Sequence, residues 1–62
     1  MNTIKDYTWN YYLYVVININ TDKMYETGDL DDARSTYHEW LELFPGDKII
    51  IQQQHNVARR IL

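Results

Sequence analysis

Hydrophobic and polar positions follow three different patterns along this chain, and two glycines and a single proline separate the patterns. The first pattern is the run YYLYVVINI at residues 11–19, which is rich in aromatic and β-branched side chains. Such a run predicts a β-strand. Residues 20–23 are mostly turn formers. A short second strand over residues 24–27 is therefore expected to return beside the first as a hairpin.

The second pattern covers residues 29–44 and predicts an amphipathic helix. Its apolar side chains fall within one arc of about 100°, and most of its acidic side chains fall on the opposite arc. Asp29 suits the N-cap position, and Asp31 and Asp32 suit the positive end of the helix dipole. The proline–glycine pair that follows is expected to end the helix. The residues expected to face the sheet are Leu30, Ala33, Tyr37, Trp40, Leu41 and Phe44.

The third pattern predicts a strand over residues 48–54, in which polar side chains begin at Gln52. Residues 56–62 can extend this strand, form a short helical turn, or fray. The element order is strand, strand, helix, strand, which predicts a small two-layer α+β domain with one helix packed on a three-stranded sheet. The pattern leaves open whether the last strand runs parallel or antiparallel to its neighbour. The whole chain is expected to form a single domain, with residues 1–9 and 56–62 as candidates for flexible ends.

The first strand is apolar on both faces, whereas one helix covers only one face of a sheet. If Leu13, Val15 and Ile17 meet the helix, the opposite face carries a contiguous apolar patch, and such patches mark interfaces. We therefore predict a dimer interface or second interface on that face. Its residues are Tyr12, Tyr14, Val16 and Ile50. The alternative is that the N-terminal segment, with Ile4, Tyr7 and Trp9, folds back over this face.

Composition limits the ways in which so small a chain can be stabilised. The chain has 62 residues and no cysteine, which excludes disulfides, thiol chemistry and cysteine-ligated zinc. Its two histidines alone do not predict a structural metal site, and no cofactor is expected. A domain of this size supplies about 3–5 kcal/mol from its core alone. Tight packing or self-association remain as sources of stability.

Charge is distributed unevenly along the chain. The net charge is -3, which disfavours direct nucleic-acid binding. Residues 22–47 carry eight acidic side chains against Lys23 and Arg34, a balance of -6, whereas residues 48–62 carry three basic side chains and no acidic one. No apolar run approaches the roughly 20 residues of a membrane span, and the N-terminus lacks the pattern of a secretory signal. We expect a soluble, cytoplasmic protein.

The acidic residues of the middle segment allow two interpretations. They can form a solvated surface, or they can form a partner-binding surface that imitates a row of phosphates and suits a protein built to grip DNA. Residues three or four apart on a helix lie about 5–6 Å from each other, which is close to the spacing of phosphates. The candidate partner-binding residues are Asp22, Glu26, Asp29, Asp31, Asp32, Glu39 and Glu42.

No combination of residues predicts catalysis. The chain has no glycine-rich phosphate loop and no Ser-His-Asp spacing. His38 and His55 fall on different elements and are expected at the surface. Asp31 and Asp32 point about 100° apart on a helix, and a solvated carboxylate lacks the raised pKa of a general acid. We therefore expect a protein without enzymatic activity.

The layout resembles small phage-encoded inhibitors of host proteins. One such family inhibits uracil-DNA glycosylase by imitating DNA, and another inhibits bacterial RNA polymerase with the same element order and an acidic helix. The stretches that carry the resemblance to the first are YYLYVVINI, NTDKMYETG, DLDDARSTYHEWLELFP and GDKIIIQQQ. The stretch that carries the resemblance to the second is ETGDLDDARSTYHEWLELFPGDKIIIQQ. The likeness concerns pattern and composition, and it transfers no individual binding residue.

These observations together predict a non-enzymatic inhibitor or modulator. It is expected to bind a host protein, such as a DNA- or RNA-handling enzyme, through an acidic surface. The alternative is a homodimeric adaptor or assembly protein that uses the aromatic sheet face. A third possibility, nucleic-acid binding through stacked tyrosines and the basic tail, is disfavoured by the net charge.

Overall fold

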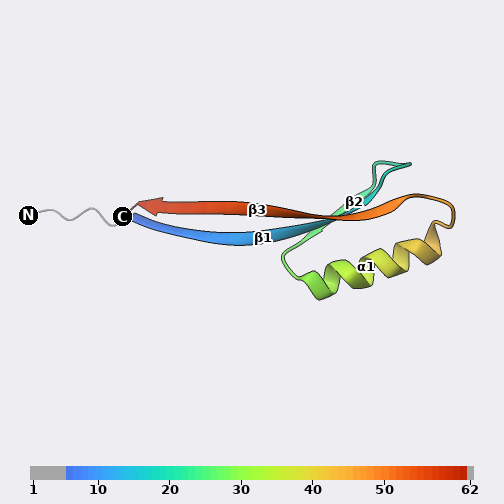
Figure 1. Cartoon of the computed structure of the whole chain (residues 1–62), viewed down its shortest axis with the longest axis horizontal. Coiled ribbons are helices and arrows are strands. Elements are labelled where there is room, and N and C mark those ends of the chain that lie inside the picture. Colours follow the sequence, from blue (N-terminus) through green and yellow to red (C-terminus); the bar gives the residue numbers. More distant parts are fainter. Residues whose placement is uncertain (1–5, 62) are drawn as a thin grey trace, which may run out of the picture.

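The computed structural model describes residues 6–61. Three strands and one helix follow each other in this part of the chain. They are β1 (Asp6–Asn18), β2 (Met24–Thr27), α1 (Leu30–Leu43) and β3 (Ile49–Ile61). The strands form one sheet in the order β2-β1-β3, and α1 lies against one end of it (Figure 1). This confirms the predicted α+β class and the element order.

Both long strands extend well beyond their predicted limits. β1 begins at Asp6, and β3 continues to Ile61. They pair antiparallel without interruption, from Asp6 opposite Ile61 to Asn18 opposite Ile49. The C-terminal tail therefore extends the third strand, and it forms neither a helical turn nor a frayed end over residues 56–61. The antiparallel orientation settles the question that the sequence left open.

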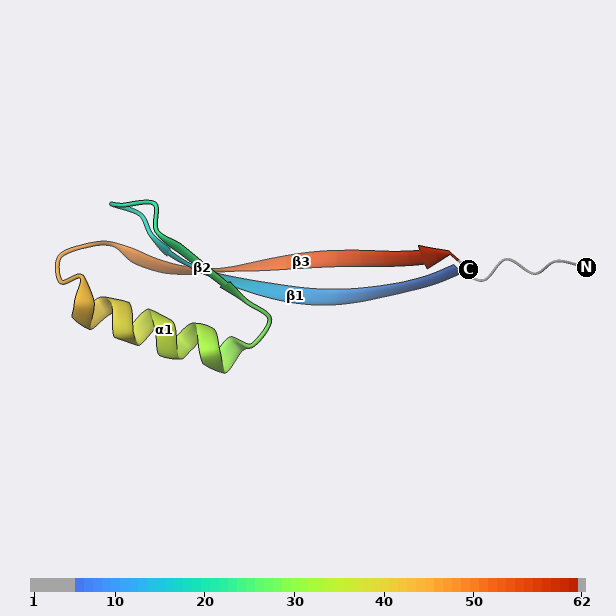
Figure 2. The same ribbon diagram turned by 180° about the vertical axis from the view of Figure 1, so that it is seen from behind.

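The sheet has two parts because β2 is so short. β2 pairs with β1 only from Tyr14 to Ile17. We call the strand segments 14–18 and 49–53, together with β2 and α1, the body. We call the two-stranded ribbon of residues 6–13 and 54–61 the arm. The arm runs away from the helix as a bare ribbon (Figures 1 and 2).

The helix begins and ends as its sequence predicts. The Asp29 side chain caps the N-terminus by accepting a hydrogen bond of 2.9 Å from the Asp31 N–H. At the other end, the Phe44 N–H donates to the Trp40 carbonyl at 2.9 Å. Gly46 follows with φ +91°, a conformation that side chains disfavour. The chain can therefore turn sharply from the helix into β3.

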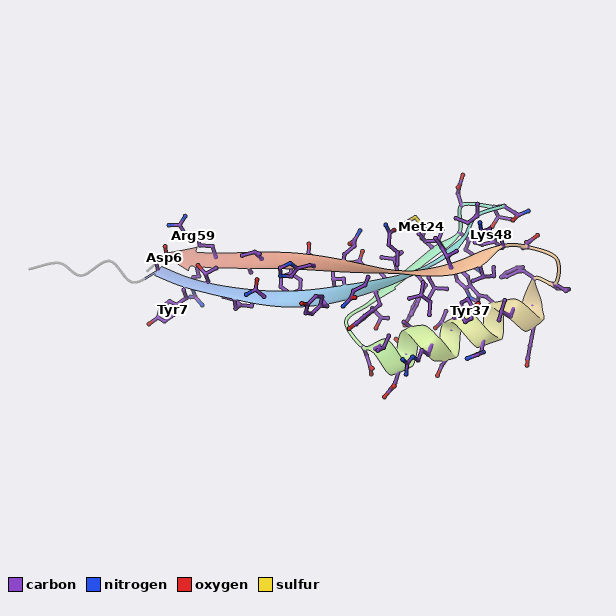
Figure 3. The ribbon with its side chains drawn as sticks, viewed as in Figure 1. Asp6, Tyr7, Met24, Tyr37, Lys48 and Arg59 are labelled. Atoms are coloured by element: carbon purple, nitrogen blue, oxygen red, sulfur yellow. The ribbon has the colours of Figure 1, made fainter. Side chains whose placement is uncertain are left out.

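The core lies between α1 and the adjacent face of the sheet. Its cluster consists of four buried side chains, which are Val16, Ala33, Trp40 and Ile49. Val15 is buried as well, at 1% exposed, but it points to the opposite face of the sheet. Partly buried side chains pack around them, and these are Tyr14, Tyr37, Phe44 and Ile51. Figure 3 shows Tyr37 between the helix and the sheet. Leu30 and Leu41 stay exposed, contrary to prediction, because they lie at one margin of the apolar arc of α1.

The face of β1 that meets the helix is the opposite of the one considered first. Val16 and Tyr14 pack against the helix, so Leu13, Val15 and Ile17 point to the other side. The neighbouring strands distinguish the two faces at the centre of the body. Val16 lies between Tyr25 and Ile51, whereas Val15 lies between Glu26 and Gln52. At this central pair the helix covers the side with the apolar cross-strand neighbours, although Ile17 on the open face also has apolar ones.

Alternation then assigns every residue of β1 to one of two faces. The helix-side face carries the even-numbered residues of β1 and their cross-strand partners. The open face carries the odd-numbered ones. Along β1 the open face consists of Tyr7, Trp9, Tyr11, Leu13, Val15 and Ile17. Tyr7 and Trp9 continue the strand and do not fold back over the sheet as the alternative prediction required, and Ile4 lies outside the described residues.

Candidate functional site

The acidic side chains of the middle segment do not form one continuous row. Asp31, Glu39 and Glu42 are exposed and lie on the side of α1 that faces away from the core. Glu26 lies on β2 opposite Val15 and therefore belongs to the open face. Asp22 lies in the turn between β1 and β2, with φ 62°. The candidate partner surface is thus reduced to the outer side of α1.

Two further acidic residues of the predicted set have structural partners. Asp29 caps the helix. The Oδ2 atom of Asp32 accepts a hydrogen bond of 2.6 Å from the Tyr25 hydroxyl, which joins α1 to β2. This hydrogen bond, with smaller contributions from desolvation and from the nearby charges of Asp32 and Asp29, raises the pKa of Tyr25 above its usual value. The Asp32 carboxylate accepts a hydrogen bond from the protonated Tyr25 hydroxyl but would repel a Tyr25 phenolate, so it favours the protonated form.

The acidic side chains on the outer side of α1 form no salt bridge with a basic residue in the described part of the chain. The salt bridge found among residues 6–61 joins Arg59 and Asp6 in the arm, at 2.6 Å. The Lys23 ammonium lies over the rings of Trp40 and Phe44, at 5.3 and 5.2 Å from their centroids. Lys23 is therefore engaged with the aromatic core side of α1 and not with its acidic side.

The predicted second interface does not exist as a single patch. Val16 is fully buried, and Tyr14 packs on the core beneath the helix. Ile50 pairs with Ile17 and lies on the open face. Of the four predicted residues, Tyr12 alone is largely exposed, at 48%, and its ring stacks on His55. The prediction was wrong because it placed the helix against the opposite face of β1.

A different aromatic surface lies on the open face of the arm. Tyr7, Trp9 and Tyr11 project from alternate positions of β1 and are 47%, 46% and 41% exposed. We call these three residues the aromatic stripe. The strict alternation of polar and aromatic residues in DYTWNY is the signal that could have identified them. The predicted strand starts at Tyr11, where the unbroken aromatic and β-branched run begins, so Tyr7 and Trp9 fall in the N-terminal segment before it.

The histidines lie at the surface, as expected. The His55 Nε2 atom lies 2.9 Å from the Asn10 Oδ1 atom and shares a hydrogen bond with it across the arm. His38 is exposed on α1 with its ring edge-on to Tyr37. Within residues 6–61 the structure contains no enclosed pocket and no cluster of side chains suited to a metal ion. The described surface presents carboxylates, aromatic rings and a strand edge.

Comparison of the chain with protein-family models, with curated proteins and with solved structures found no match. The helix in the described part of the chain is too short and too polar to cross a membrane.

Proposed function

We propose that this chain is a non-enzymatic protein-binding inhibitor or modulator, and that the outer side of α1 is its recognition surface. The observation that carries the proposal is the set of exposed carboxylates Asp31, Glu39 and Glu42, none of which forms an ion pair with a described basic residue. Unpaired surface carboxylates of this kind attract a basic partner at long range and set the orientation of the encounter.

The spacing of these carboxylates defines what they can imitate. Asp31 and Glu42 are eleven positions apart, or about 16 Å along the helix axis at 1.5 Å per residue. Phosphates along one nucleic-acid strand, spaced a little wider than about 5–6 Å, number about three over such a distance. Asp31, Glu39 and Glu42 reproduce the sign, length and number of that charge row, although their spacing is uneven. A DNA- or RNA-handling protein with a basic groove is the partner class that this arrangement suits.

The setting of this activity follows from the resemblance to phage inhibitors. In this proposal the protein acts in the host cytoplasm, and binding blocks or modulates the host protein without chemical modification. The acidic balance of residues 22–47 supports this interpretation.

A pull-down comparison tests the proposal. The wild-type chain and a triple variant, Asp31→Lys with Glu39→Lys and Glu42→Lys, serve as baits in a bacterial lysate at low and high salt. Asp32 is left intact because its bond to Tyr25 supports the fold. The matched control is Glu26→Lys, a reversal on the open face. We expect the wild type and the control to retain a nucleic-acid-handling protein that salt releases, and the triple variant to lose it.

Retention of the same protein by the triple variant would overturn the proposal, provided that circular dichroism shows its helix intact.

A second candidate function, a homodimeric adaptor or assembly protein, is favoured by one specific observation. The open face carries the exposed aromatic stripe, and no described element covers it. This differs from the predicted patch in its residues, but it retains the idea that an aromatic sheet surface joins two copies.

A further inference from the structure

The geometry points to a two-fold dimer in which the arms of two copies pair edge to edge. We infer that residues 6–12 of β1 run antiparallel to the same residues of a second copy, with Trp9 opposite Trp9 of that copy. The result is a four-stranded ribbon. This inference gives the homodimer candidate a specific interface and does not depend on the acidic surface of α1.

The first observation is the free edge of β1 in the arm. β1 is the central strand of the sheet, but β2 reaches only from Tyr14 to Ile17. From Asp6 to Leu13, β1 pairs with β3 alone. A strand edge of this length is a template for pairing with another chain.

The hydrogen-bond pattern shows which backbone groups are free. The Asn18 N–H donates to the Lys23 carbonyl at 2.9 Å, and the Asn18 carbonyl accepts from the Asp22 N–H at 2.8 Å. Both groups thus point towards the β2 side. The β1–β3 ladder has no bulge, so the same holds for the other even-numbered residues of β1. In the arm, the groups that point to the free edge belong to Asp6, Thr8, Asn10 and Tyr12.

Because the even-numbered residues carry the free backbone groups, they must lie opposite even-numbered residues when β1 pairs with β1 of a second copy. With Trp9 on the two-fold axis, Thr8 lies opposite Asn10 of the second copy and Asp6 lies opposite its Tyr12. These are the hydrogen-bonded pairs, because they present the free groups to each other. Trp9 opposite Trp9 and Tyr7 opposite Tyr11 are then non-hydrogen-bonded pairs, in which side chains approach most closely. Every ring of the aromatic stripe gains an aromatic cross-strand neighbour.

The charges of the arm favour β1 over β3 as the pairing edge. Charged side chains are a common protection of strand edges. β3 carries Arg59 and Arg60 in the arm. If two copies paired through β3 in this segment, the arginines of one copy would lie close to those of the other. The described arm segment of β1 carries Asp6 alone, and its carboxylate is bound by Arg59 at 2.6 Å. Figure 3 shows Asp6 and Arg59 together at the tip, with Tyr7 directed to the other side. Self-pairing through β1 brings no like charges together.

The exposed area of the aromatic stripe sets an upper limit on the aromatic area that edge pairing can bury. Each aromatic residue buries about 150–250 Å² when covered. Since Tyr7, Trp9 and Tyr11 remain 41–47% exposed, the stripe leaves roughly 200–350 Å² per copy accessible, and a strand added beside β1 covers only the flanks of these rings. A standard interface buries about 800 Å² per partner, so edge pairing forms a small interface with a concentration-dependent equilibrium. An isolated two-stranded ribbon is marginally stable in water, and pairing doubles its number of strands.

Sedimentation velocity of the purified chain over a concentration series, with Thr8→Pro as the variant, tests the inference. Thr8→Pro removes an N–H on the free edge and leaves the bonds to β3 in place, because Thr8 directs its backbone groups away from β3. We expect the wild type to dimerise with rising concentration. We expect Thr8→Pro to raise the dissociation constant at least about tenfold, with unchanged circular dichroism. A monomeric wild type at all concentrations, or a folded Thr8→Pro variant that dimerises equally well, would overturn the inference.

Cross-linking provides a second measurement that does not depend on the proline variant. Because the chain has no cysteine, Trp9→Cys places one thiol of each copy opposite the other on the axis, within disulfide reach. Tyr7→Cys is the matched control, since its two copies lie about 14 Å apart along the strands. We expect rapid oxidation to a covalent dimer for Trp9→Cys and not for Tyr7→Cys. The reverse result, or equal rates, would contradict the register. These assays use the purified chain, so their failure leaves the pull-down proposal unaffected.

Discussion

The side-chain amide of Asn18 donates a hydrogen bond of 3.0 Å to the Oδ2 atom of Asp47, which joins the end of β1 to the loop before β3. Asn18 is fully buried, although it is polar. Its Oδ1 atom accepts from the backbone N–H groups of Asn20 and Thr21, at 2.9 and 3.2 Å. One side chain therefore holds the β1–β2 turn and the α1–β3 loop together.

Replacement of Asn18 should lower the free energy of unfolding by a large part of the roughly 3–5 kcal/mol that a core of this size supplies. Asn18→Ala leaves two N–H groups without their acceptor and removes the donor to Asp47. We expect a loss of about 1–3 kcal/mol in the free energy of unfolding, measured by urea denaturation followed by circular dichroism. The control is Asn56→Ala, because the Asn56 side chain makes one hydrogen bond, at 3.5 Å. Equal effects of the two variants would contradict the role assigned to Asn18.

The two glycines should respond oppositely to alanine. Gly46 has φ +91°, where a side chain is strained even though its Cβ atom would meet no atom within 4 Å. We expect Gly46→Ala to cost about 1–2 kcal/mol. An added Cβ at Gly28 also meets nothing within 4 Å, and its φ is not in the left-handed range. Gly28→Ala should therefore be neutral or stabilising by up to about 1 kcal/mol. Thermal denaturation of both variants compares them directly.

The two tryptophans should differ sharply in their importance for folding. Trp40 is 6% exposed in the core, whereas Trp9 is 46% exposed in the arm. Truncation of a buried tryptophan to alanine costs about 3–5 kcal/mol, which is as much as a core of this size supplies. We expect Trp40→Ala to lose its native circular dichroism spectrum in water. Trp9→Ala, measured at a concentration at which the chain is monomeric, should retain the spectrum.

Tyr25 should titrate at a higher pH than an ordinary tyrosine side chain. Its hydrogen bond to Asp32 raises the pKa of Tyr25 in the folded chain above the ordinary value of about 10. This contribution to stability is fully present below the unfolded-state pKa and is lost as the pH rises through the folded-state value. We expect Asp32→Asn to lower the pKa of Tyr25, as followed by NMR of its ring resonances. Glu39→Gln, on the outer side of α1, is the control that should leave it unchanged.

The sequence was sufficient for the elements of the body because local signals and burial agree there. Asp29, the apolar arc of α1 and the Pro45–Gly46 pair predicted a helix within one residue of its observed limits at each end. The contacts of Ala33, Trp40 and Phe44 with the sheet were also predictable. These features depend on helical periodicity, which a single segment displays by itself.

The arm and the orientation of β1 could not be predicted in the same way. β1 is apolar on both faces in the body, so the side that meets the helix depends on which cross-strand neighbours Val15 and Val16 receive. That information lies in the register with β2 and β3. The extension of β3 through its polar residues likewise requires the opposing residues of β1. Non-local pairing, and not intrinsic preference, determines this half of the fold.

The length of chain between β1 and β3 has a consequence for how the protein forms. Asp6 and Arg59 are 53 positions apart in the sequence, and all contacts between the two longest strands are of this non-local kind. Proteins dominated by such contacts fold slowly, because a large loop must close before the pairing is rewarded. During synthesis β1 is made before β3, so its tyrosines stay unpaired and accessible to other nascent chains and chaperones until β3 has been synthesised. The hairpin with β2 and the helix are local and can form in that interval, whereas closure of the ribbon requires β3.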